Sequence, residues 1–140
     1  MRRPSLAASA VAVLVAISMV RPASAADYSV AYALETDGKT ETGKIESCNT
    51  VDSCQIKFHA IDATAELRYS SNPADGNKVV LSMRGDSACC FFRDGNDSIS
   101  LDPATRLHVV TIYAGHARRG NEVVKNQELG VLYLSFAMSR

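Results

Sequence analysis

Apolar residues recur at every second position along most of this chain, and this alternation limits the folds that are open to it. In the segment 27–34, Tyr28, Val30, Tyr32 and Leu34 fall on one face of an extended chain, and smaller or polar residues fall on the other. A strand with one buried face gives this pattern, whereas a helix repeats its apolar residues every three to four positions. No amphipathic helix is predicted after residue 25. The alternation therefore predicts an all-β domain.

Turn-forming residues divide the alternating segments into short strands. Asp37-Gly38 suits a tight hairpin, because glycine adopts positive φ at no steric cost. The segments 72–77, 93–97 and 102–103 are also rich in Gly, Pro, Asn and Asp, and predict loops. The expected fold is a small antiparallel β-sandwich, or a partly open barrel, of about eight strands. The predicted strands are 27–35, 43–48, 54–60, 64–70, 78–84, 89–92, 97–101, 106–113 and 130–137.

One of these segments, 107–113, is apolar or β-branched at positions of both faces. Val109 and Thr111 fall on one face, and Val110 and Ile112 fall on the other. Strands that are covered on both faces read as nearly continuous apolar runs. We therefore expect a central strand here.

The first residues have the pattern of a secretory signal peptide. Arg2 and Arg3 precede the uncharged apolar run 6–20, and Ala23-Ser24-Ala25 follows as a small-residue cleavage site. The run is shorter than the roughly 20 residues of a membrane-spanning helix. We expect residues 1–25 to be removed, which leaves a single domain of 115 residues, 26–140, with no membrane span. The predicted location is periplasmic or secreted.

Charge argues against one class of partner. The leader contains three of the 15 basic residues and no acid, so the mature chain has 12 basic and 15 acidic residues and a net charge of −3. Proteins that bind nucleic acid neutralise phosphates with clustered Lys and Arg. Nucleic acid is therefore not the expected partner.

Four cysteines in a small exported domain predict two disulfides. Cys48 and Cys54 flank a polar turn between two strand-like segments, so a bond between them would clip the tip of a hairpin. In that case Cys89 and Cys90 are bonded to each other or free. The alternative is a pair of cross-bridges that join Cys48 and Cys54 to Cys89 and Cys90. The sequence leaves these pairings open.

The cysteines and histidines offer two kinds of site chemistry. A soft metal could bind thiolates at Cys89-Cys90, but no C-x-x-C spacing or paired histidines accompany them, and we expect no metal and no cofactor. His59, His108 and His116 show no spacing that joins them to a nucleophile. A small hydrolase that uses one of these histidines with nearby carboxylates remains the enzymatic alternative.

The segment 115–122 is the candidate recognition loop. It carries His116, Arg118 and Arg119 on a long connection of an otherwise acidic domain. Loops on a rigid sandwich often carry recognition, and arginine suits carboxylate or phosphate partners. Arg84-Gly85-Asp86 spells an adhesive tripeptide, which a strand end followed by a glycine turn also explains.

Together these features predict a small exported domain without catalytic activity. It would bind a protein or a small anionic ligand through its loops, and one version of this role is an inhibitor of a secreted enzyme. That inhibitor role is an analogy of size and location. The hydrolase and the thiol or metal module at Cys89-Cys90 are the alternatives.

Overall fold

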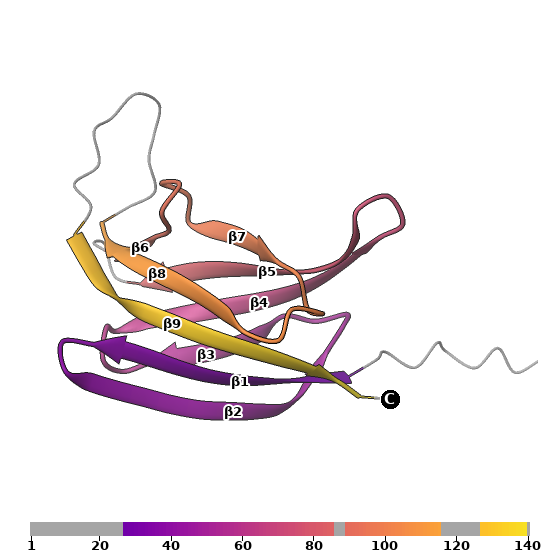
Figure 1. Cartoon of the computed structure of the whole chain (residues 1–140), viewed down its shortest axis with the longest axis horizontal. Helices are drawn as coiled ribbons and strands as arrows, with labels where there is room; N and C mark the ends of the chain where they lie inside the picture. The colour runs from indigo at the N-terminus through magenta and orange to yellow at the C-terminus, as the bar shows by residue number, and fades with distance from the viewer. Residues whose placement is uncertain (1–26, 86–88, 116–126, 140) are drawn as a thin grey trace, which may run out of the picture.

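The computed structural model describes residues 27–85, 89–115 and 127–139 and shows two antiparallel sheets packed face to face (Figure 1). The strands are β1 (Asp27–Thr36), β2 (Lys39–Asn49), β3 (Cys54–Phe58), β4 (Ala63–Asn72), β5 (Gly76–Gly85), β6 (Cys89–Phe91), β7 (Ser98–Leu101), β8 (His108–Ala114) and β9 (Gln127–Met138). One sheet has the order β2-β1-β9-β8-β6, and the other has the order β3-β4-β5-β7. The predicted antiparallel β-sandwich is confirmed, with nine strands in the described residues. The barrel alternative is wrong, because the sheets do not close on each other.

The core lies between the two sheets and is built from the alternating apolar positions. Its larger fully buried members are Tyr28, Val30, Leu34, Ile56, Phe58, Leu67, Leu81, Phe92, Ile112, Leu132 and Leu134. Tyr28 packs between Tyr69 and Phe136, with ring centroids 5.9 Å and 6.3 Å away. Burial of these side chains is the main favourable term for a fold of this kind.

A two-residue hairpin joins β1 to β2, as predicted. Asp37 and Gly38 have φ of +21° and +75°, and Thr36 pairs with Lys39 across the turn. Positive φ at both central residues is the mark of the hairpin turns that match the twist of a sheet. The turn fixes the register of β1 against β2 from its closed end.

Cys48 and Cys54 form a disulfide, with their Cα atoms 5.6 Å apart. The sequence predicted this pairing as one of two alternatives, and the cross-bridges to Cys89 and Cys90 are wrong. The structural role expected for the bond is also wrong. Cys48 is the next-to-last residue of β2 in one sheet and Cys54 begins β3 in the other, so the bond joins the two layers at a corner and does not clip a hairpin.

Cys89 and Cys90 are bonded to each other at the start of β6. Cys90 is buried in the core and Cys89 is partly buried. The described residues therefore contain no free thiol. None of the described segments forms a helix with the length and hydropathy that crossing a membrane requires.

Candidate binding site at the open side of the sandwich

The candidate loop residues predicted from the sequence, His116, Arg118 and Arg119, lie outside the described residues. Asp86 of the Arg84-Gly85-Asp86 tripeptide lies outside them as well. The site described below is therefore built from other residues, which the strands themselves place.

The side of the sandwich at β2 and β3 is closed by two links between the sheets. The Cys48–Cys54 disulfide is one of them. Glu41 of β2 is the other: its Oε2 atom accepts hydrogen bonds from the backbone N–H groups of His59, at 3.0 Å, and Ala60, at 3.1 Å. His59 and Ala60 follow directly after β3, in the opposite sheet. β2 and β3 are the edge strands of their sheets, so these links join the two layers without pairing either edge in the described residues.

The opposite side is open, because β6 is much shorter than its neighbour β8. β6 pairs with β8 only where Phe91 meets Tyr113 and Cys89 meets Ala114. Over the rest of its length, β8 pairs with β9 on one side, and no other described strand pairs with its second side. β7 ends the second sheet here, and among the described strands it pairs only with β5. Figure 1 shows β7 and β8 along this side of the molecule.

The register of the sheet identifies which backbone groups of β8 face this opening. The hairpin makes Thr36 and Lys39 a hydrogen-bonded pair, and bonded pairs alternate along an antiparallel ladder. Carried through β1 and β9, this alternation turns the N–H and C=O groups of His108, Val110 and Ile112 toward β9. The backbone bond from Ser139 to Asp27, at 2.9 Å, fits the same alternation. The N–H and C=O groups of Val109 and Thr111 therefore point away from β9, toward the open side.

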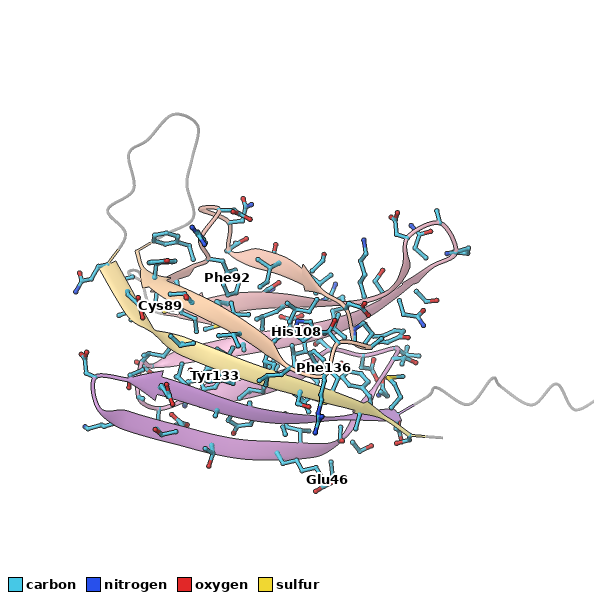
Figure 2. The ribbon with its side chains drawn as sticks, viewed as in Figure 1. Glu46, Cys89, Phe92, His108, Tyr133 and Phe136 are labelled. Carbon is cyan, nitrogen blue, oxygen red and sulfur yellow. A yellow bond between two sulfur atoms is a disulfide. The ribbon has the colours of Figure 1, made fainter. Side chains whose placement is uncertain are left out.

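A groove of about 330 Å³ lies between β8 and β7 on this side. It is lined by Phe92, Arg93, Asp94, Ile99, Leu101, His108, Val109, Val110 and Thr111. A tight turn bounds one end, where the N–H groups of Phe92 and Gly95 donate to Asn96 and Phe92 respectively, both at 2.8 Å. The connection after β7 bounds the other end, where His108 Nε2 lies 2.7 Å from the carbonyl oxygen of Asp102. Phe92 and His108 are labelled near these two ends in Figure 2.

Exposed apolar side chains stand beside this groove. Val109 is 59% exposed, and Leu107, which directly precedes β8, is 54% exposed. The sequence predicted a central strand here because apolar residues occupy positions of both faces. β8 does lie between β9 and β6 in the sheet, as predicted, but β6 pairs only with Tyr113 and Ala114, so residues 108–112 are paired on one side only. The apolar residues on the outer face of β8 are exposed to solvent. The sequence pattern predicted their burial, so the exposed apolar surface that they form was missed.

The side chains in the groove give little support to a catalytic centre. His108 is the histidine that lines it, and its ring nitrogen Nε2 contacts a backbone carbonyl rather than a carboxylate. The ring of His108 packs edge-on against Phe136, with centroids 5.6 Å apart, which ties it to the core. No group of three or more His, Cys, Asp or Glu side chains in the described ranges could hold a metal ion.

Two further hollows differ from the groove in chemistry. One, of about 520 Å³, lies at the β1–β2 hairpin and the start of β9, and its charged lining is mainly acidic: Glu35, Asp37 and Glu128 against Lys39. The other, of about 340 Å³, lies at the β4–β5 turn and the end of β7. The β7–β8 groove has three buried apolar residues in its lining, Phe92, Leu101 and Val110, whereas the lining of the other two hollows includes only Leu101 as a buried apolar residue.

Comparison of the chain with protein-family models, with curated proteins and with solved structures finds no match.

Proposed function

We propose that this protein is an exported binding domain without catalytic activity that takes up a short extended segment of a partner protein along the free edge of β8. The observation that carries the proposal is the unpaired edge at Val109 and Thr111, which runs beside an apolar groove. Addition of a strand to an exposed sheet edge is a common mode of peptide recognition. The Cys48–Cys54 disulfide is compatible with a periplasmic or secreted location.

Backbone groups of β8 would supply much of the affinity. Val109 and Thr111 together offer two N–H donors and two C=O acceptors at the open edge. Each backbone hydrogen bond adds a net 0.5–1.5 kcal/mol, so the four together contribute about 2–6 kcal/mol before the entropic cost of association. Burial of the exposed side chains of Leu107 and Val109 adds to this sum. These magnitudes suit a reversible complex.

The groove also defines the chemistry of the partner segment. Side chains alternate between the two faces of an added strand. Those on its inner face would meet Phe92, Ile99 and Leu101, so they should be apolar. Arg93 and Asp94 carry opposite charges at one end of the groove, so a strong preference for one sign of charge is not expected. β6 and the 102–107 connection limit the paired length to a few residues.

The experiment uses substitutions at an exposed residue of the edge. Val109→Pro removes one edge N–H donor, and proline is tolerated on an edge strand where its nitrogen faces solvent. Val109→Lys keeps the donor but replaces the apolar side chain with a charged one. Val51→Lys is the matched control, because Val51 is also an exposed valine. Its side chain is 76% exposed and lies in the turn between β2 and β3, away from the groove. Purified wild-type protein and each variant are incubated with extracytoplasmic proteins of the source cells, and captured proteins are compared.

The proposal predicts a partner that wild-type protein and Val51→Lys capture equally and that both Val109 variants lose. A synthetic peptide from that partner, with apolar residues at alternate positions, should then compete for capture. The proposal is overturned if capture is unchanged by Val109→Pro and Val109→Lys, or if no protein is captured. Circular dichroism of each variant checks that the β-fold is retained.

A further inference from the structure

The outer face of the β3-β4-β5-β7 sheet has a charge that differs from the rest of the domain. Alternation along these strands turns four basic residues outward: Lys57 on β3, Arg68 on β4, and Lys78 and Arg84 on β5. The described residues contain eight lysines and arginines and thirteen aspartates and glutamates. This one face therefore presents four of the eight bases and, at its strand positions, only Glu66 of the thirteen acids. Net charge of the whole chain hides this segregation.

Three of these bases gather at one part of the face. Lys57, Thr64 and Arg84 lie in one row across β3, β4 and β5, and Glu66 lies in the next row. Lys78 is farther along β5, in the hollow that Asp75 also lines. The basic cluster is therefore defined here as Lys57, Arg68 and Arg84.

Glu66 holds two of the cluster's guanidinium groups next to each other. Arg68 Nη2 lies 2.9 Å from Glu66 Oε1, and Arg84 Nη2 lies 3.4 Å from Glu66 Oε2. Glu66 is only 8% exposed and is the buried charged residue of the described chain. The arginine side chains remain 67% and 76% exposed. A guanidinium has five N–H donors, so each arginine keeps donors that face solvent.

We infer that this face is a second binding surface, and that its ligand is an acidic polysaccharide. The two arginines, spaced by one carboxylate, offer forked donors to the carboxylate or sulfate groups of such a polymer. Serine and threonine hydroxyls surround them at Thr64, Ser82 and Ser98, where they can bond to sugar hydroxyls. This surface is separate from the β7–β8 groove, and the inference does not depend on the proposed function.

The composition of the face favours a polysaccharide over other polyanions. Val80 is the apolar side chain among its outward strand positions, and none of those positions holds an aromatic residue. Protein interfaces gain most of their energy from buried aromatic and arginine anchors, and single-stranded nucleic acid stacks on aromatic rings. Binding in a membrane interface needs an apolar anchor. This sheet face is flat, basic and rich in hydroxyl groups. It has arginine anchors but no aromatic or large apolar anchor.

The test measures binding of the full chain to polygalacturonate, which carries carboxylates, and to dextran sulfate, which carries sulfates, with neutral dextran as the control polymer. The wild-type protein should bind at least one acidic polymer at about 50 mM NaCl, and more weakly at about 500 mM, because added salt screens charges at shorter range. Neutral dextran should not bind. The comparison of the two polymers identifies which acidic group is preferred.

Two face variants, each with a matched control, locate the binding on the face. Lys57→Gln removes an exposed cation, and its matched control is Lys39→Gln. The triple variant Glu66→Gln/Arg68→Gln/Arg84→Gln removes both arginines without leaving an unpaired buried carboxylate. Its control is Lys39→Gln/Lys44→Gln, which lowers the net charge further but changes the β1–β2 side of the domain. We expect the triple variant to lose about tenfold or more in affinity, since two charge-assisted contacts are removed, and the controls to lose less than about twofold.

The inference is overturned if neither acidic polymer binds the wild-type protein at low salt, or if the control variants lose as much affinity as the face variants. It is also overturned if the acidic polymers fail while duplex DNA, an acidic protein or anionic phospholipid vesicles bind. If the triple variant does not fold, Lys57→Gln against Lys39→Gln decides, and equal affinity of these two would contradict the inference.

Discussion

Replacement of Tyr28 by phenylalanine should make this protein more stable. Tyr28 is fully buried, and its hydroxyl group has no hydrogen-bond partner among the described residues. A buried hydroxyl without a partner costs about 1–3 kcal/mol of stability. Phenylalanine keeps the ring that packs against Tyr69 and Phe136 and removes this cost.

The expected gain is about 1 kcal/mol in the free energy of unfolding, because the small void left by the oxygen atom offsets part of the saving. For a domain of this size, that gain raises the melting temperature by about 4 °C. Thermal unfolding followed by circular dichroism and urea unfolding followed by tyrosine fluorescence both measure it. Tyr133→Phe is the control, because the hydroxyl of Tyr133 donates to Glu35 Oε2 at 3.1 Å at an exposed position. Its effect should stay within about 0.5 kcal/mol.

The same substitution should change the response to high pH. Burial, and secondarily the charge of Tyr69, raises the pKa of Tyr28 above its ordinary value of 10.0. The folded state therefore holds this proton more tightly than the unfolded chain does. The protonated hydroxyl makes its full contribution to the free energy of unfolding below about pH 10, and this contribution declines above that pH. Tyr28→Phe should reduce this decline, and its advantage over the wild type should grow above pH 10. A destabilisation of 1 kcal/mol or more by Tyr28→Phe would refute the reasoning, because it would mean that the hydroxyl has a bonding partner.

Two further substitutions test a close contact within one sheet and a link between the two sheets. Gly130→Ala should destabilise the fold by about 1–3 kcal/mol in urea unfolding, because the added methyl group would overlap the backbone carbonyl of Glu35. An effect below about 0.5 kcal/mol would contradict the packing of β9 on β1. Glu41→Ala should lower the free energy of unfolding by about 1 kcal/mol and increase amide exchange at His59 and Ala60, because it removes the hydrogen-bond acceptor that links these residues to the other sheet. Unchanged exchange at both residues would show that Glu41 does not link the sheets here.

The architecture of this protein follows closely from its sequence, for a physical reason. Alternation with period two fixes which side chains are buried once a strand forms, and residues such as Asp37-Gly38 fix where a strand reverses. The strands and the sandwich were therefore predictable. The assignment of strands to sheets was not, because local pattern does not state which neighbour a strand pairs with. For that reason, Cys48 and Cys54 were expected at a hairpin tip and in fact join two sheets.

The candidate site was predictable only in part. The apolar pattern around Val109 was visible, but the free backbone edge beside it depends on β6 being too short to pair with the rest of β8, and the length of a neighbouring strand is a tertiary property. The basic cluster was invisible for the same reason, because Lys57, Arg68 and Arg84 come from three strands and converge only through the register. The predicted loop residues His116, Arg118 and Arg119 lie outside the described chain, so their role stays a prediction.

Residue-by-residue amide hydrogen exchange of the free protein, followed by NMR, tests the free edge of β8 most directly. The N–H groups of His108, Val110 and Ile112 point toward β9 and should exchange slowly, whereas those of Val109 and Thr111 should exchange quickly. On addition of the captured partner peptide, Val109 and Thr111 should become protected. Protection of Val109 and Thr111 equal to that of Val110 and Ile112 in the free protein would mean that the edge is already paired, and would contradict the account.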